Sequence, residues 1–346
     1  MLTPKTFFLA VLGLLGLIAA LLYINPSSKA GPQVVVYTSV DAEFALPLFE
    51  RFTKETGMQV IPNTDSEASK TTGMAGRLLQ LKDNPDGDVF WNSELSFTQV
   101  LADKGALEPY LSPQAKDIPS DYKDTQNQWT GFGCRARVLL YNTQRVRRDE
   151  VPKNLEDLAA PRWKDRFALA KPLFGTTRSH LVSLVITLGE KKAFALFRAW
   201  RDNGVVLAES NGDVRDRVAN GLSDIGLTDT DDAFSALDRK KPVDFVVPDQ
   251  TADWPGAYLV PNTVAMLKHC PHPVQARAFI DFLLKPETEA WLAQQDARQI
   301  PVRNVGVQLS AQLKDLKPVK VDAAKLAEQV LPMGERIYRV LRGEEQ

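Results

Sequence analysis

The feature that most restricts the fold is an order of segments that recurs along the chain. A short apolar run is followed by a polar cluster and then by a segment with helical periodicity. Residues 34–37 (Val-Val-Val-Tyr) precede a Thr-Ser pair and a helical pattern over 42–56, and the order repeats after 58–62 and 88–91. Continuous β-branched runs are typical of strands buried on both faces. The alternation therefore predicts an α/β fold in which mostly parallel sheets are flanked by helices.

A second series of such units follows a long apolar segment at residues 129–141, which we expect to be a strand that crosses between two lobes. Further strands are predicted at 167–170, at 205–208 and around Ile225. A chain of 346 residues is long for one domain, so two lobes are expected. The predicted lobes are residues 31–133 with 255–305, and residues 134–254 with 306–346.

The first 30 residues have the pattern of an export signal. Lys5 precedes an almost wholly apolar run at 7–24, and Ser28-Lys29-Ala30 offers a small-x-small cleavage site. The run is also close to the length that spans a bilayer. Residues 1–30 are therefore either a cleaved signal peptide or an uncleaved anchor, and either way the remaining chain is exported. We expect membrane contact only through this segment.

Composition and motifs exclude several classes of function. The net charge of −1 leaves no basic footprint for nucleic acid. The three histidines lack metal-ligand spacing, and neither a nucleophile motif nor a phosphate-binding loop occurs. No motif calls for catalysis, so an enzymatic activity is not expected. Cys134 and Cys270 could pair in an oxidising compartment, but their spacing does not show proximity.

Polar side chains gather where the predicted strands end and the predicted helices begin. In open α/β sheets ligands bind at this edge, where free backbone N–H groups favour anions. Each such residue alone could simply cap a helix, but several of them on two lobes facing one cleft predict a ligand site. The candidates are Ser39, Ser66, Thr71, Thr72, Ser93, Glu94, Gly175, Thr176, Thr177 and Asn211.

Asp229, Asp231 and Asp232 follow the predicted strand around Ile225. Carboxylates this close repel one another unless water, a cation or hydrogen-bond donors satisfy them. A solvated turn that caps the next helix is the simplest interpretation. In one alternative, Glu94, Asp229 and Asp231 bind a hard cation such as Fe(III) or Ca(II) together with an anion. In the other, the carboxylates hold an ammonium group or hydroxyls, while helix N-termini hold a phosphate, phosphonate or carboxylate.

The order of several motifs resembles one known family. The motifs are Val-Val-Tyr-Thr-Ser at 35–39, Asp-Val-Phe-Trp-Asn-Ser-Glu at 88–94, Arg-Ala-Arg-Val-Leu-Leu-Tyr-Asn at 135–142, Gly-Thr-Thr at 175–177, Pro-Asn-Thr-Val-Ala at 261–265 and the segment 272–284. They resemble periplasmic solute-binding proteins of ABC importers, in the ferric-ion-binding-like branch of family 1, over residues 34–305. The resemblance implies a two-lobed, type II-like periplasmic binding protein fold. It also implies a monomer that closes on a ligand and delivers it to a permease and its ATPase.

One departure from the family pattern leaves the ligand open. Ferric binders of this family carry two adjacent tyrosines where this chain has Thr230-Asp231, and many carry a His or Tyr in the region that here reads Ser39-Val40-Asp41. Gly175-Thr176-Thr177 and Asn211 match the positions that hold the family's synergistic anion, and Glu94 is one position from its metal-binding acid. The ligand is then either Fe(III) as cargo, held with an anion, or a small anionic or zwitterionic compound such as an organophosphonate or sugar phosphate. No resident cofactor is expected. A membrane-anchored sensor or enzyme that reuses the fold is the alternative function.

Overall fold

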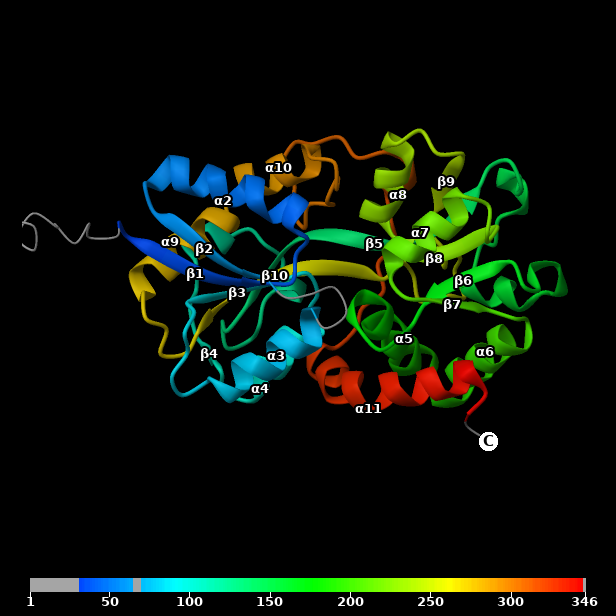
Figure 1. The fold of residues 1–346 in the computed structure, drawn as a ribbon, viewed down its shortest axis with the longest axis horizontal. Coiled ribbons are helices and arrows are strands. Elements are labelled where there is room, and N and C mark those ends of the chain that lie inside the picture. Colours follow the sequence, from blue (N-terminus) through cyan, green and yellow to red (C-terminus); the bar gives the residue numbers. More distant parts are fainter. Residues whose placement is uncertain (1–30, 65–69, 345–346) are drawn as a thin grey trace, which may run out of the picture.

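In a computed structural model of the chain, residues 31–64 and 70–344 are described (Figure 1). Among these residues, no helix is both long enough and apolar enough to cross a membrane. Some predictions fall outside what is described: the signal peptide or anchor at 1–30, Ser66, and the side chains of Thr71 and Thr72.

The described strands and helices form two groups along the long axis of the molecule (Figure 1). The first group contains β1 (Gln33–Thr38), α2 (Ala42–Thr56), β2 (Gln59–Thr64), α3 (Lys70–Gln80), β3 (Val89–Asn92), α4 (Ser96–Asp103), β4 (Leu107–Glu108), β10 (Leu259–Leu267), α9 (Pro273–Leu283) and α10 (Pro286–Gln294). The second contains β6 (Phe167–Ala170), α5 (Gly175–Leu188), α6 (Glu190–Asp202), β7 (Val206–Ala208), α7 (Asn211–Ala219), β8 (Ile225–Asp229), α8 (Thr230–Asp238) and β9 (Val243–Val246). β5 (Thr130–Asn142) and α11 (Ala323–Arg342) belong to both.

The strands are arranged as parallel sets joined by antiparallel strands in the middle. The order is β2-β1-β3-β10-β5-β8-β6-β7, with β4 on β10 and β9 on β5. The outer pairs β1–β2, β1–β3, β6–β7 and β6–β8 are parallel, whereas β10 and β5 run antiparallel to their neighbours. The predicted α/β class is confirmed. The parallel character is limited to the outer strands, because the strands between the groups run back against them.

β5 connects the two groups, as the long apolar segment at 129–141 predicted. Residues 130–136 pair with β10, whereas residues 137–142 pair with β8 and β9. One strand therefore carries side chains into both halves and into the space between them. The exact lobe boundaries given above stay a prediction.

Each of the two groups has its own apolar core. In the first, Phe52 packs edge-on against Phe279 and Phe282, with ring centroids 5.1 and 5.3 Å apart. In the second, Trp200 packs edge-on against Phe167 at 5.6 Å. Figure 1 shows α11 along one side of the second group, with its first turns near α4, and it packs on α4, α5 and α6. These cores fix the strand ends that build the site described next.

Candidate ligand-binding cleft

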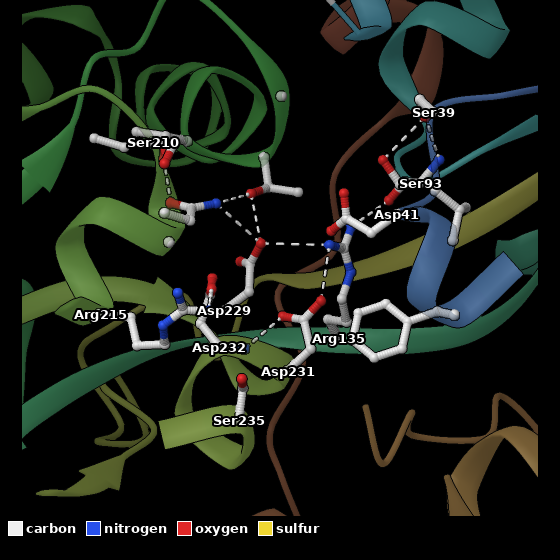
Figure 2. Close-up of a pocket in the computed structure, with 18 of the residues that line it drawn as sticks. Ser39, Asp41, Ser93, Arg135, Ser210, Arg215, Asp229, Asp231, Asp232 and Ser235 are labelled. Carbon is white, nitrogen blue, oxygen red and sulfur yellow. Dashed lines mark hydrogen bonds and ion pairs between the residues drawn. The ribbon is translucent and has the colours of Figure 1, made fainter. Parts of the chain in front are cut away.

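A cleft of about 980 Å³ opens between the two groups of strands. Its walls are the ends of β1, β3 and β8 and the first turns of α2, α5, α7 and α8. Figure 2 shows side chains from both walls pointing into it. The structure brings together most of the residues predicted from sequence: Ser39, Ser93, Gly175, Thr176, Thr177, Asn211, Asp229, Asp231 and Asp232.

Glu94 is the predicted site residue that the structure places elsewhere. Its buried carboxylate accepts hydrogen bonds from the backbone N–H of Ser96 (2.8 Å) and Phe97 (3.0 Å) and from the Ser96 hydroxyl (2.6 Å). It therefore satisfies the first turn of α4, where orphan N–H groups attract a carboxylate, and it does not line the cleft. This corrects the predicted metal-ligand set, because Glu94 does not join the aspartates.

A buried ion pair lies at the floor of the cleft. Arg137 of β5 is directly opposite Asp229 of β8 in the strand register, and Arg137 Nη1 lies 2.7 Å from Asp229 Oδ1. Their side chains are 0% and 2% exposed. Burial opposes ionisation of Asp229, but the guanidinium groups of Arg137 and Arg135 outweigh it and hold the pKa of the carboxyl below its usual value. Asp229 is therefore an ionised carboxylate whose negative charge is balanced by the neighbouring guanidinium groups.

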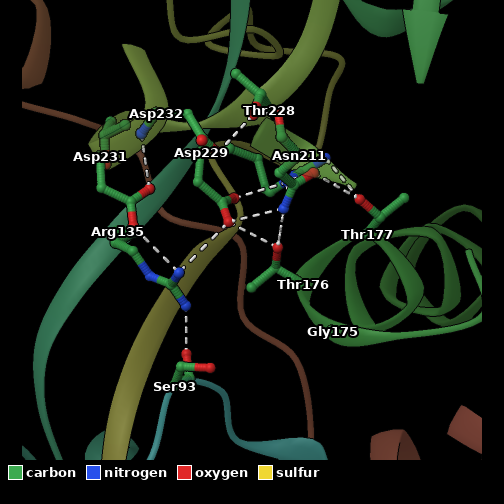
Figure 3. Close-up of polar contacts among 12 residues, drawn as sticks. Ser93, Arg135, Gly175, Thr176, Thr177, Asn211, Thr228, Asp229, Asp231 and Asp232 are labelled. Carbon is green, nitrogen blue, oxygen red and sulfur yellow. Dashed lines mark hydrogen bonds and ion pairs between the residues drawn. The ribbon is translucent and has the colours of Figure 1, made fainter. Parts of the chain in front are cut away.

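The polar residues of α5 and α7 complete this pair (Figure 3). Thr176 Oγ1 donates to Asp229 Oδ2 at 2.7 Å, and Asn211 Nδ2 donates to the same oxygen at 3.1 Å. Arg137 Nη2 donates to Thr177 Oγ1 at 3.2 Å. The side chains predicted to hold an anion are thus engaged with the ion pair. At the start of α5, the backbone N–H groups are therefore the polar groups available to contact a ligand.

A glycine allows α7 to reach this position. A Cβ atom at Gly226 in β8 would lie 2.4 Å from Val214 Cγ1 of α7, which real Cβ contacts do not allow. The helix therefore packs directly on the backbone of β8, and its first residue, Asn211, reaches Asp229.

Arg135 extends from β5 across the cleft. Its Nη1 lies 3.3 Å from Asp231 Oδ2 and 3.6 Å from Asp229 Oδ2, while Nη2 donates to the carbonyl oxygen of Ser93. Burial opposes the charge, but Asp231 and Asp229 outweigh it and raise the pKa of the guanidinium. Arg135 thereby connects β3, in the first group, to β8 and α8 in the second.

Asp232 is the least neutralised of the three aspartates. It accepts a hydrogen bond from Thr228 Oγ1 at 2.8 Å, and Arg215 Nη1 is 3.4 Å away. Arg215 itself is held more closely by Asp216, at 2.8 Å. Burial, and then the charges of Asp231 and Asp229, raise the pKa of Asp232 to about 8. A carboxyl with this pKa is largely protonated at pH 7, because Arg215, which Asp216 holds more closely, does not offset burial and the two neighbouring charges.

The aspartates still have the spacing of a possible metal site. One oxygen from each of Asp229, Asp231 and Asp232 lies within 4.8 Å of the others. However, a guanidinium group already approaches each of these carboxylates, and no tyrosine, histidine or cysteine is among the described residues that line the cleft. The arrangement is chemically a network of ion pairs beside uncapped helix starts.

Sequence reasoning did not include Arg135, Arg137 and Arg215 among the site residues. A signal for the first two was present, because they stand two apart in an apolar strand and so share one face. Buried guanidinium groups need acidic partners, and the Asp-rich segment supplies them.

Comparison with known proteins places this cleft in a family. The family model described as bacterial extracellular solute-binding protein matches residues 88–325. The chain belongs to this family. Its role is therefore to bind a solute, as the motifs predicted. The matched relatives are binding proteins and not enzymes, which fits the expectation drawn from the absence of catalytic motifs.

Relatives of this solute-binding protein carry names that refer to iron. It is 26% identical to the Fe(3+)-binding periplasmic protein of Serratia marcescens, over 87% of this chain and 88% of that one. It is also 26% identical to the major ferric iron-binding protein of Neisseria meningitidis, over 76% of this chain and 79% of that one. The resemblance to the ferric-ion-binding-like branch is thereby confirmed.

Solved structures share the two-lobed periplasmic binding protein fold. Iron-bound HitA from Pseudomonas aeruginosa superimposes with a TM-score of 0.79 at 23% identity, covering 88% of this chain and 99% of that one. AfuA from Actinobacillus pleuropneumoniae, with exogenous fructose-6-phosphate bound, gives 0.74 at 21%, covering 91% and 98%. At these identities the likeness concerns the fold alone.

Proposed function

We propose that this protein captures a small organic anion in the cleft, in the periplasm, and delivers it to an ABC permease and its ATPase. The periplasmic names of the relatives support the location. The fold alone does not select the solute, since one structural neighbour holds iron and another a sugar phosphate. The selection therefore rests on the residues of the cleft.

The observation that carries the proposal is the internal pairing of the aspartates. Asp229 is paired with Arg137 at 2.7 Å and Asp231 with Arg135 at 3.3 Å. With its pKa near 8, Asp232 contributes little negative charge at neutral pH. Hard cations bind oxygen clusters that keep their charge and lone pairs free. The three aspartates are already engaged by arginines, and Asp229 and Asp232 also accept hydrogen bonds from threonine hydroxyl groups.

Helix starts from the two walls favour an anion. α2 in one wall and α5 in the other each begin without a side-chain hydrogen bond to the first turn, among the residues that the structure describes. Gly175 and Thr176 of α5 line the cleft, as do Ala42 and the acidic Glu43 of α2. Because the carboxylate of Glu43 opposes an anion, the start of α5 is the stronger of the two positions. Each helix start is equivalent to about half a positive charge and presents free N–H groups. A phosphate, phosphonate or carboxylate that touched both starts would favour closure of the walls upon it.

Fe(III) with a synergistic anion is the second candidate. It is favoured by the carboxylate oxygens within 4.8 Å of one another and by the names of the relatives. In that case Arg135 would have to leave Asp231 before the ion could bind. The two candidates can be separated by testing whether the purified protein binds Fe(III) with an anion or an organic anion alone.

A thermal-shift screen followed by calorimetry tests the proposal. Sugar phosphates and organophosphonates are compared with Fe(III) supplied with citrate or phosphate. A solute at about 100 times its dissociation constant stabilises by about 2.7 kcal/mol, which moves the melting temperature by a few degrees. We expect a shift with a phosphate or phosphonate compound and none with Fe(III). A shift with Fe(III) alone would refute the organic-anion proposal.

Variants test where the solute binds, and X-ray scattering tests whether the two lobes close on it. Ser39→Ala removes a cleft hydroxyl and should weaken binding. Ser112→Ala is a matched control, because Ser112 is equally buried and donates to Asp281 outside the cleft. Closure predicts a smaller radius of gyration with the solute bound, and superimposable scattering curves would contradict it.

A further inference from the structure

Asp229 and Asp231 lie on the same wall of the cleft, and both carboxylates are directed toward the guanidinium of Arg135 (Figure 3). Arg135 Nη1 lies 3.6 Å from Asp229 Oδ2 and 3.3 Å from Asp231 Oδ2. Its Nη2 is fixed by the carbonyl oxygen of Ser93, and the side chain is only 12% exposed. The guanidinium is therefore anchored on both walls and is not a mobile surface charge.

A metal ion bound by these aspartates would lie beside that guanidinium. Oxygen ligands hold hard cations at about 2.0 to 2.6 Å. Arg135 Nη1 lies only 3.3 and 3.6 Å from the same oxygens, so an ion bound to them would be close to the guanidinium. Arginine does not lose its proton in proteins. Cation and guanidinium would then compete for the same carboxylate lone pairs and repel each other.

We propose that Arg135 determines the specificity of the cleft against metal ions, by taking the place of a cation between Asp229 and Asp231. This inference rests on the organic-anion function proposed above. Ser93 and the two aspartates hold the guanidinium in position, so the cleft remains closed to a bare cation and open to a solute that brings an anion. Removal of the guanidinium should uncover a latent oxygen-ligand metal site.

The test is a gain of metal binding, measured with Tb(III), a trivalent ion that takes oxygen ligands and has no redox chemistry under these conditions. Tb(III) alone is titrated at pH 7 into the full-length protein and into Arg135→Met, Arg135→Lys and Arg135→Met/Asp231→Asn, by calorimetry. Luminescence lifetimes in H₂O and D₂O count the water molecules left on the ion. Arg298→Gln is the matched control, because Arg298 forms an ion pair with Asp238 at 2.6 Å away from the cleft.

We expect Arg135→Met to bind Tb(III) at least about tenfold more tightly than the wild type, with fewer waters on the ion, since one nearby positive charge is lost. Arg135→Lys should exclude the ion because it keeps the charge. The double variant should lose the gain because a ligand is removed. Absence of Tb(III) binding by a folded Arg135→Met, or an equal gain in Arg298→Gln, would overturn the inference.

The outcomes separate this inference from the proposed function. Binding of Tb(III) by the wild type as tight as by Arg135→Met, with no organic anion bound, would contradict both, whereas an organic anion bound by the wild type together with no gain in Arg135→Met would contradict the inference alone. A variant that is unfolded by itself but folds on addition of Tb(III), as seen by circular dichroism, has the same meaning as a gain of binding. Arg135→Gln, which can still donate to the Ser93 carbonyl, is the second variant, and no Tb(III) binding by either one overturns the proposal.

Discussion

Replacing Arg137 by methionine should destabilise the protein strongly, because the substitution leaves a buried charge without its partner. The Arg137 side chain is 0% exposed, and it donates to Asp229, Thr176 and Asn211 at 2.7, 3.3 and 3.1 Å. In Arg137→Met, Asp229 keeps its hydrogen bonds from Thr176 and Asn211 and the more distant Arg135 at 3.6 Å. Breaking a buried ion pair on one side typically costs about 3 to 5 kcal/mol. We expect a loss in that range at pH 7.

The loss should depend on pH in a defined direction. In the wild type the folded-state pKa of Asp229 lies below its ordinary value, so its contribution to stability is present above the unfolded pKa of about 3.9 and is lost as the pH falls through the folded pKa. In Arg137→Met, desolvation should raise the pKa of Asp229 above the unfolded value. The deficit relative to the wild type should therefore be largest at neutral pH and shrink toward pH 4.

Urea unfolding followed by tryptophan fluorescence and circular dichroism measures these changes. The matched variant is Arg137→Met/Asp229→Asn, which removes the charge from both partners and should recover most of the loss, because no buried charge is left uncompensated. A loss below about 1 kcal/mol in Arg137→Met, or a double variant as unstable as the single one, would refute the reasoning that Asp229 is ionised and neutralised by Arg137.

Two further predictions concern acidic residues in and beside the cleft. Because the pKa of Asp232 is raised to about 8, the folded state keeps a proton that the unfolded state releases near pH 4, so stability falls as pH rises between these values. The stability of Asp232→Asn relative to the wild type should therefore increase from pH 5 to pH 8, and urea midpoints that differ by a constant amount would contradict this. Glu94→Gln should lower stability by about 1 to 2 kcal/mol, because the carboxylate caps α4. Its solute affinity in calorimetry should be unchanged, and a loss of affinity would return Glu94 to the site.

Local patterns were sufficient to predict most elements of the fold. The helical spacing over 42–56 predicted α2, and Gly57, whose φ is 73°, ends it as a glycine in the left-handed region does. The antiparallel centre of the sheet was not predicted. The direction of β5 and β10 depends on which distant strands they meet, and no local pattern encodes this.

The cleft was predicted in outline and wrongly in one detail. Helix starts at strand ends are recognisable from polar clusters, which is why Ser39 and Gly175, which both line the cleft, were among the predicted residues. The same reasoning included Glu94, because a residue that caps a helix and a residue that binds a ligand have the same composition and position in a sequence. Only the orientation of the side chain separates the two roles, and packing sets it.

The aspartates of the cleft illustrate what a cluster of like charges means in a sequence. Considered alone, three carboxylates at the end of a strand are compatible with a solvated turn, with a cation site or with a site for a donor-rich solute. Arg137 lies 92 positions from Asp229 in the sequence, yet the register of β5 and β8 places the two opposite each other. The buried strand β5 carries two positive charges, on Arg135 and Arg137, that need acidic partners. The aspartates supply these partners, and the arginines in turn compensate the negative charges of the aspartates. The charges of these aspartates are thus balanced within the protein, and under the proposed function a solute recognised in the cleft is held by hydrogen bonds and helix starts.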